Sequence, residues 1–402
     1  MRNVLFNLVI FLLLSIGISC KSNNSSTDYL QKVLGNLEKI ESATYLSLTE
    51  IWQPGDTIPQ GVYSRVYKEF SNPVDTTIGA SFVWYNAEDS TKFIYCYNGV
   101  ISAYVNRDEK IIDVDNFIRD RGFSFRLVPP PFFNYTKNII KYALTTKDSI
   151  ILDFKELDKY YYCKLVINED KQVEFFGKAC YMPKNPYTLD PTSIYELWIN
   201  KSNNLPYKVR REMSHQISAS TVSNVELNKL SIADFNIQDY FPNDYEIRKS
   251  GEANKEKKES NLIGKKAPSW ILNDKNEQSV TLSDLKGKVS LIQFTGIGCG
   301  VCIISIPFLK ELREEYSEDD LGLVAIETWV RRTQSLQNYS KKYGINYSLL
   351  SGTDEVDKNY EINGFVPVFF ILDKNHIIRK VIKGYREEET KKDIVETIKE
   401  LL

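Results

Sequence analysis

Histidine is almost absent from this sequence, which contains only His215 and His376 among 402 residues. A catalytic triad that relies on histidine, or a metal centre built from several imidazoles, is therefore not expected. His215 lies in a polar stretch and His376 in a DKN turn signal, so we expect both on the surface. We predict neither a metal nor another cofactor.

Excess charge of one sign is also missing, because 51 basic and 53 acidic side chains leave a formal net charge of -2. Nothing in this balance favours a phosphate backbone, so we expect no nucleic-acid partner. Beyond the N-terminus, no apolar run is long enough to span a membrane. The length suffices for two domains that each bury a core of their own.

Residues 1–19 have the pattern of a secretory signal peptide, with Arg2 followed by an apolar run and then small residues. The run stops at Cys20, before the polar stretch KSNNSST, and so resembles a bacterial lipoprotein signal. The resemblance implies that Cys20 is lipidated and that residues 20–26 form a tether. It places the protein on the periplasmic face of a bacterial membrane, the outer rather than the inner, held there by its lipid anchor. An ordinary cleaved signal followed by a stray cysteine is the alternative.

The next part of the chain, residues 27–247, indicates a mainly antiparallel β domain. Apolar residues at helical spacing from Leu30 to Ile40 predict one helix. After it the pattern alternates, in aromatic-rich runs separated by turns. The order of elements resembles that of the LolA/LolB lipoprotein-handling domains, which implies a curved sheet around a helix with an apolar concavity. Charged and polar residues dominate 248–262, which we interpret as a linker.

Two cysteines of this β domain lie in neighbouring runs, Cys163 in YYYCKLVI and Cys180 in VEFFGKACYM. We predict that the runs pair as a hairpin across the NEDK loop, which brings the cysteines together. In an exported protein such a pair can oxidise, so we predict a structural disulfide, with separate buried thiols as the alternative. Cys96 is then a small buried apolar residue.

The stretch FTGIGCGVCIISIP places Cys299 and Cys302 three residues apart, where an apolar strand passes into an amphipathic helix. A cysteine at a helix N-terminus faces free amide groups and the positive end of the helix dipole, and both favour the thiolate. The second cysteine can then attack a mixed disulfide within the same molecule. We predict that Cys299 is the exposed nucleophile and Cys302 the buried resolving thiol. A zinc knuckle would need a second pair of ligands, which the sequence lacks.

Residues 263–402 alternate strands with helices and end in a hairpin, which predicts a mixed α/β sheet. The order GKKAP, LSDLKGK, CGVC, NGFVPVFFILD and KGY resembles the TlpA/ResA branch of thioredoxin-fold thiol-disulfide oxidoreductases. The resemblance implies that Val366 and Pro367 form a cis-proline loop that receives the substrate. It also implies exchange with protein thiols and disulfides, in the direction of a reductase supplied by a membrane or periplasmic electron donor. The alternative is a binding lipoprotein that carries an apolar ligand in its β domain, with a non-catalytic thioredoxin fold as a partner module.

Three positions depart from the pattern of that family. Gly298 replaces the tryptophan usual before the first cysteine, and we expect the loss of this ring to open the site. Gln293 and Ser305 stand where thioredoxins and ResA-like proteins, respectively, carry a carboxylate that can take the resolving proton. The proton of Cys302 must therefore go to water, to the substrate or to a carboxylate from elsewhere, such as Glu327.

Overall fold

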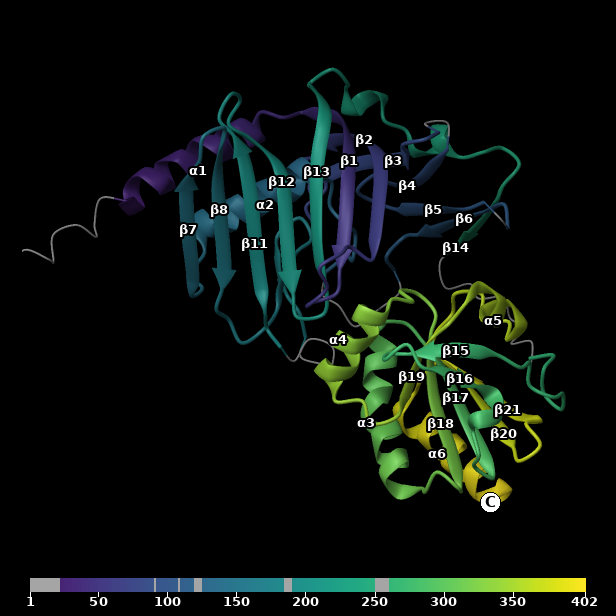
Figure 1. The fold of residues 1–402 in the computed structure, drawn as a ribbon. Coiled ribbons are helices and arrows are strands. Elements are labelled where there is room, and N and C mark those ends of the chain that lie inside the picture. The colour runs from purple at the N-terminus through teal and green to yellow at the C-terminus, as the bar shows by residue number, and fades with distance from the viewer. Residues whose placement is uncertain (1–21, 90–91, 108, 119–124, 184–189, 250–259) are drawn as a thin grey trace, which may run out of the picture.

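The computed structural model has two parts, a large sheet with two helices and a smaller α/β domain (Figure 1). It describes residues 22–89, 92–107, 109–118, 125–183, 190–249 and 260–402. The predicted signal peptide, Cys20 and most of the expected linker lie outside these ranges. No helix in the described ranges has the length and hydropathy needed to cross a bilayer.

The large sheet contains twelve strands. They are β1 (Ser42–Trp52), β2 (Gly61–Ser71), β3 (Ala80–Asn86), β4 (Phe93–Tyr97), β5 (Ser102–Asn106), β6 (Ile111–Asp115), β7 (Ile150–Glu156), β8 (Tyr160–Ile167), β11 (Ser193–Asn200), β12 (Leu205–Met213), β13 (Ile217–Leu227) and β14 (Glu246–Lys249). The order across the sheet is β14-β6-β5-β4-β3-β2-β1-β13-β12-β11-β8-β7. All neighbours are antiparallel except β14 and β6, which are parallel. The predicted antiparallel sheet is thus confirmed.

Two helices, α1 (Ser22–Glu38) and α2 (Phe132–Thr145), lie on one face of this sheet (Figure 1). The apolar residues of α1 that predicted a helix are buried in a core shared with α2 and strands β8, β11 and β12. Helix α2 is absent from the sequence-based prediction of a single helix. It follows a run of prolines, and its N-cap, Pro131, makes no side-chain capping hydrogen bond.

The capping groups of α2 come instead from β1 and β2. The buried Glu69 carboxylate accepts hydrogen bonds from the backbone N–H groups of Phe133 and Asn134, at 3.1 and 2.7 Å. The Tyr45 hydroxyl accepts the N–H of Phe132 at 2.8 Å and donates to Glu69 at 2.9 Å. Three amides that a helix leaves unpaired at its start are therefore satisfied by another element. Burial raises the pKa of Glu69 to about 6, against the opposing effect of these hydrogen bonds.

The predicted disulfide between Cys163 and Cys180 is wrong. Strand β8, which carries Cys163, pairs with β7 and β11. Cys180 lies in a separate two-stranded sheet of β9 (Val173–Phe175) and β10 (Ala179–Tyr181). The two runs are not arms of one hairpin, and both cysteines are free and buried, as is Cys96. Burial raises the pKa of the Cys163 thiol to about 12, so the group remains a neutral apolar side chain.

His215 is also not where the sequence suggested, since it is buried rather than exposed. Its Nδ1 atom lies 3.4 Å from Nε2 of Gln172, another buried side chain. Burial lowers the pKa of His215 to about 3, so the imidazole is neutral at physiological pH. The polar sequence around His215 did not indicate that this side chain is buried, because the burial comes from packing between segments that are distant in the sequence.

The smaller domain is built on a mixed sheet of seven strands in the order β16-β15-β19-β18-β17-β20-β21. Its strands are β15 (Ile271–Asp274), β16 (Ser279–Thr281), β17 (Val289–Thr295), β18 (Leu321–Glu327), β19 (Ser348–Ser351), β20 (Val368–Asp373) and β21 (Ile378–Lys383). Its helices are α3 (Gly300–Glu315), α4 (Thr333–Tyr343), α5 (Asp354–Asn359) and α6 (Glu387–Leu401). Three 3₁₀ helices occur in the described part of the chain, η1 (Ile232–Asp234), η2 (Ile237–Tyr240) and η3 (Leu282–Asp284).

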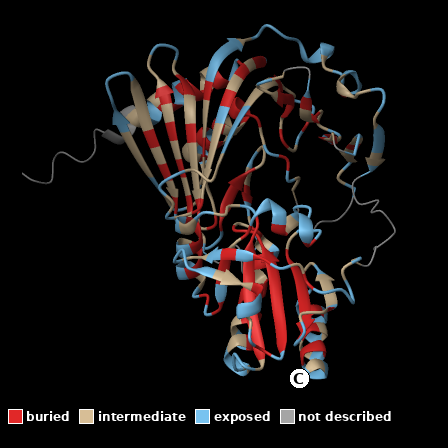
Figure 2. Ribbon diagram, turned by 45° about the vertical axis from the view of Figure 1, so that its right-hand side comes forward, coloured by how far each residue is buried: buried red, intermediate tan, exposed pale blue. Residues whose placement is uncertain are grey.

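Strand β17 is the centre of this domain, since every one of its residues is buried (Figure 2). It lies between β18, which is parallel to it, and β20, which is antiparallel. Val289 and Leu291 pack with residues of α3, α4 and α6, whereas Ile292 and Phe294 pack with residues at and after α5. Successive side chains of a strand point to opposite faces, so β17 is held from both sides. A rigid strand therefore leads directly into the CGVC segment.

We predict that the stability of the large domain depends on pH through Glu69. Because its pKa is raised from 4.5 to about 6, the folded state holds this proton more tightly than the unfolded state. The stabilisation is complete below pH 4.5 and is lost as pH rises through 6. The free energy of unfolding of the wild type minus that of Glu69→Gln should fall by about 2 kcal/mol between pH 4 and pH 7. Urea unfolding at four pH values measures this difference.

The matched control is Glu88→Gln, which removes an exposed carboxylate from the turn after β3. The difference in the free energy of unfolding between the wild type and Glu88→Gln should stay nearly constant over the same pH range. A wild-type advantage over Glu69→Gln that grows with pH would show that the three hydrogen bonds to the Glu69 carboxylate outweigh burial, and would contradict the prediction.

Candidate redox site

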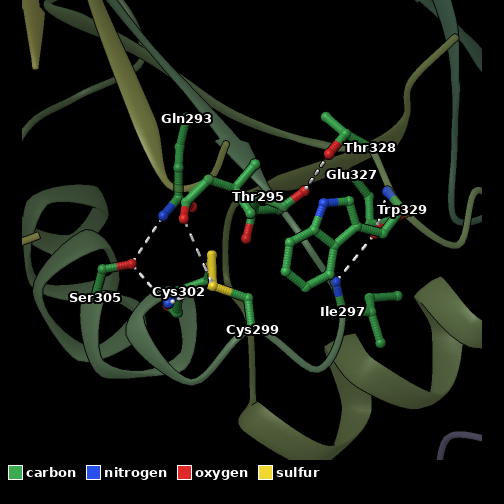
Figure 3. The surroundings of a disulfide bond; sticks show 10 residues. Gln293, Thr295, Ile297, Cys299, Cys302, Ser305, Glu327, Thr328 and Trp329 are labelled. Carbon is green, nitrogen blue, oxygen red and sulfur yellow. Dashed lines mark hydrogen bonds between the residues drawn. A yellow bond between two sulfur atoms is a disulfide. The ribbon is translucent and has the colours of Figure 1, made fainter. Parts of the chain in front are cut away.

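Cys299 and Cys302 form a disulfide at the start of α3, immediately beyond the end of β17 (Figure 3). Cys299 is the N-cap of the helix, as predicted, and its Sγ accepts the backbone N–H of Cys302 at 3.2 Å. The same sulfur lies 3.9 Å from the carbonyl oxygen of Val366. The Val366–Pro367 peptide bond is cis, and β20 begins at the next residue. A strand end, a helix start and this loop therefore meet at one sulfur atom.

Both sulfur-bearing residues are buried, in contrast to the expected exposure of Cys299. Cys299 is 8% exposed and Cys302 0%. The order of exposure agrees with Cys299 as the attacking group, but the site is largely covered. Part of the cover is Gln53, which follows β1 of the other domain and is itself 7% exposed. Its Nε2 atom lies 3.1 Å from the point that a Cβ on residue 298 would occupy.

The glycine before the first cysteine has a conformational reason. Gly298 has a φ of +90°, which side-chain-bearing residues rarely adopt. The family pattern would place an indole at residue 298. In this protein an indole near the site comes instead from a residue beyond the end of another strand, β18. Trp329, two residues beyond β18, packs on Gly296 so closely that a Cβ there would lie 2.5 Å from the ring (Figure 3). The expectation that the missing ring opens the site is therefore wrong.

Trp329 and Gln53 are the two site residues that the sequence analysis missed. Trp329 carried a usable signal, because it follows a buried parallel strand, and the carboxyl ends of such strands share the edge that bears the cysteines. Its indole is 50% exposed, so it remains accessible to a partner. Gln53 carried no signal, because it lies some 250 positions before the cysteines, in the sequence of a different domain.

The positions that lack a carboxylate are joined by hydrogen bonds. Gln293 donates from Nε2 to the Ser305 hydroxyl at 2.8 Å, and this hydroxyl donates to the carbonyl of Cys302 at 2.7 Å. All three residues are buried, so no solvent separates them. These hydrogen bonds between β17 and α3 orient the turn around Cys302. They provide no group that can accept the thiol proton of Cys302 at neutral pH.

Glu327, the carboxylate considered as a substitute base, has a different set of partners. Its Oε1 atom accepts the N–H groups of Ile297 and Trp329 at 3.0 and 2.9 Å. Its Oε2 atom accepts those of Val330 and Arg331 at 2.8 and 2.6 Å. Burial raises the pKa of Glu327 above its usual value, against the opposing effect of the four N–H groups. The described hydrogen bonds of this carboxylate all go to backbone N–H groups and none to Cys302, so its role in the structure is to position these loops.

The two domains are joined beside the disulfide by the segment between β1 and β2. Asp56 accepts hydrogen bonds from Ser335 at 2.6 Å and from Asn338 at 2.9 Å, both on α4. The hydroxyl of Thr57 donates to Gln334 of the same helix at 3.1 Å. These bonds hold the segment that carries Gln53 over the redox site. Within the described ranges, no group of three His, Cys, Asp or Glu side chains is arranged to hold a metal ion.

Comparisons with known proteins relate the smaller domain to one enzyme class. The Redoxin family model matches residues 262–398. Thiol-disulfide oxidoreductase ResA of Bacillus thuringiensis subsp. konkukian is 28% identical over 146 residues, which are 36% of this chain and 82% of the relative. ResA of Bacillus subtilis is 29% identical over 143 residues, 35% of this chain and 79% of the relative.

A solved structure of a thioredoxin-family thiol:disulfide interchange protein from Chlorobium tepidum is 22% identical, with a TM-score of 0.31. It covers 35% of this chain and 99% of its own. The matching family model does not extend into the twelve-stranded sheet. Residues 262–398 form a redoxin domain of thioredoxin-like fold that is homologous to the ResA thiol-disulfide oxidoreductases, and the protein is an enzyme of that class.

Proposed function

We propose that the protein is a thiol-disulfide reductase of the periplasm, held on a membrane by a lipid on Cys20. The observation that carries the redox assignment is the oxidised pair at the N-terminus of α3, with the Val366 carbonyl beside the first sulfur. The anchor and the compartment rest on the N-terminal sequence pattern. The substrates are proteins with disulfides, and a membrane or periplasmic dithiol supplies the electrons.

In the proposed reaction the reduced enzyme attacks with the Cys299 thiolate. The substrate S–S bond breaks, a mixed disulfide with Cys299 forms, and one substrate thiolate leaves. Cys302 then loses its proton to water or to that thiolate, since neither Gln293 nor Ser305 can accept it. The Cys302 sulfur attacks Cys299, which restores the internal disulfide and releases the second substrate thiolate. Two electrons pass to the substrate, and the dithiol donor reduces the enzyme again.

The direction of a reductase is supported by the surroundings of Cys299. The Cys299 sulfur accepts a hydrogen bond from the Cys302 N–H and lies beside the Val366 carbonyl. Neither of these groups is charged. An oxidant such as DsbA owes its high potential to a strongly stabilised reduced form. The Cys302 N–H and the helix dipole stabilise the Cys299 thiolate without help from a charged partner, so we expect a reduction potential below that of DsbA.

The large sheet favours a second candidate function, that of a binding lipoprotein. Its resemblance to LolA/LolB domains suggests a carrier with an apolar concavity. The observation in its favour is a cavity of about 400 Å³ on the side of the sheet that α2 covers. The two functions are compatible, because the cavity and the disulfide belong to different domains.

We further propose that the segment between β1 and β2 restricts access to the disulfide. Gln53 lies against Gly298, and Asp56 fixes the segment to α4 with two side-chain hydrogen bonds. A folded substrate protein would have to displace the segment to reach Cys299. An extended polypeptide is narrower and can reach this sulfur past the segment. The contact thus limits which disulfides reach Cys299.

Substituting the resolving cysteine tests the redox function. Cys302→Ser leaves a nucleophile without a resolving thiol, so reduced enzyme mixed with insulin should accumulate a covalent adduct. Cys299→Ser should accumulate little, because Cys302 is fully buried. Non-reducing gel electrophoresis and mass spectrometry measure the adducts. Adducts that form mainly with Cys299→Ser would reverse the two roles, and no adduct with either variant would reject the proposed function.

The reduction potential of the pair tests the direction of electron flow. Equilibration with glutathione buffers should give a value closer to that of thioredoxin, about -270 mV, than to that of DsbA, about -120 mV. Tryptophan fluorescence gives a convenient readout, since Trp329 lies beside the site. A value near that of DsbA would contradict the reductase assignment and indicate an oxidant.

Loosening the domain contact tests the access proposal. Asp56→Ala removes both acceptors for Ser335 and Asn338, and hydrogen bonds to a charged group typically contribute about 1.5–3 kcal/mol. Reduction of the Cys299–Cys302 disulfide by glutathione should therefore become about tenfold faster or more. Glu226→Ala, a change at an exposed residue that pairs with Thr44 at the opposite end of β1 from this segment, should leave the rate unchanged. Equal rates for Asp56→Ala and the wild type would show that the segment does not limit access.

A further inference from the structure

The cavity of the large domain is lined by aromatic side chains together with a set of polar and charged ones. Its volume is about 400 Å³, within the range of small-molecule sites. The walls come from β1, β2, β3, β9, β12, β13, the proline loop before α2 and the first turn of α2. Their aromatic members include Tyr45, Tyr67, Trp84, Phe132, Tyr135 and Phe175. A ligand of this cavity therefore meets apolar surface as well as polar groups.

One positive charge in the lining has no carboxylate partner. Arg65, half-buried on β2, forms no ion pair with any residue in the described part of the chain. Its guanidinium carbon lies 5.1 Å from the centre of the Trp84 ring and 5.3 Å from that of Tyr63. Burial raises the pKa of Tyr67 to about 12, although the charge of Arg65 and a side-chain hydrogen bond from it both lower this pKa. Aromatic side chains thus hold the guanidinium at the cavity without neutralising its charge.

A second donor beside Arg65 is also unsatisfied. Trp84 is 8% exposed, and its buried Nε1–H has no hydrogen-bond partner. Buried donors without an acceptor cost free energy and are uncommon in folded proteins. An unpaired Trp84 N–H beside a guanidinium without a carboxylate partner indicates a bound group that accepts hydrogen bonds and carries negative charge.

The other charges of the lining cancel. Arg211 donates from Nε to Oε2 of Glu174 at 2.8 Å, and its Nη2 donates to Oε1 of the same carboxylate. This bidentate pair is nearly buried and neutral as a whole. The remaining lining residues are uncharged, among them Ser47, Ser218 and Val209. The cavity therefore carries a net charge of about +1 from Arg65 alone.

We propose that this cavity binds an amphiphilic monocarboxylate, with the carboxylate at Arg65 and Trp84 and the apolar body against Phe132, Phe175 and Val209. A carboxylate matches both the planar donors of the guanidinium and the single uncompensated charge. The apolar walls supply the remaining binding free energy through burial. This inference does not depend on the redox activity, since no residue of the cavity belongs to the smaller domain.

Calorimetric titration with dodecanoate, below its micellar concentration, tests the proposal on the mature chain. The wild type should bind one equivalent. Arg65→Gln should bind at least about tenfold more weakly, because a charge-assisted hydrogen bond is lost. The matched control, Lys68→Gln, removes the same charge from the same strand at a residue outside the cavity, and should change the affinity less than about twofold.

Two further measurements can overturn the proposal. Dodecyltrimethylammonium has the same tail and the opposite head charge, so it should not bind to the wild type. Ser218→Trp places a large ring in the cavity and should abolish dodecanoate binding while thermal unfolding shows an intact fold. Equal affinities of Arg65→Gln and Lys68→Gln, binding of the cationic amphiphile, full binding by Ser218→Trp, or no binding of dodecanoate by the wild type would each reject it.

Discussion

The carboxylate of Glu327 holds together the loops that frame the disulfide. It accepts one N–H from the loop before Cys299 and three from the loop after β18. The first loop sets the approach to the N-terminus of α3, and the second carries Trp329. Four backbone donors on one buried carboxylate fix both loops with little freedom, and such fixed geometry is what a catalytic group requires. The chemistry of Cys299 thus depends on a residue that takes no part in sulfur exchange.

The strand that precedes this site gives the disulfide its rigid support. Every residue of β17 is buried, and its alternate side chains pack into two separate cores. Gln293 belongs to this strand, and its amide reaches α3 through Ser305. A carboxylate at either position would serve proton transfer, whereas an amide and a hydroxyl serve geometry. The proton of the resolving thiol therefore depends on solvent or substrate, which distinguishes this site from the pattern it resembles.

The large sheet contributes to the same surface from outside the redox domain. Gln53 lies against the glycine that precedes the first cysteine, and Asp56 binds the neighbouring helix. The sheet also holds a cavity whose only uncompensated charge is Arg65. The cavity and the disulfide thus lie in separate domains of one chain, and the segment between β1 and β2 brings side chains of the large domain to Gly298 and to α4.

Local patterns in the sequence were sufficient for the redox pair, for α1 and for the alternation of most strands. Two cysteines three apart at a strand-to-helix transition depend on neighbours in the chain, so their arrangement is readable without the fold. The same holds for the hairpin of β11 and β12, which a short turn connects. Helix α2 was not readable, because its capping groups, Glu69 and Tyr45, lie on strands far earlier in the sequence.

Tertiary structure alone decided which side chains from distant segments meet. Cys163 and Cys180 are separated because β8 pairs with β7 and β11, and strand pairing is set by the whole sheet rather than by the nearest turn. The same reason applies to Trp329 and Gln53, which lie against Gly296 and Gly298, just before Cys299, and come from another strand end and another domain. The sequence by itself determined the chemistry of the sulfur pair, since that chemistry needs only local spacing. The burial of this pair was decided by packing, which brings together residues that no local pattern connects.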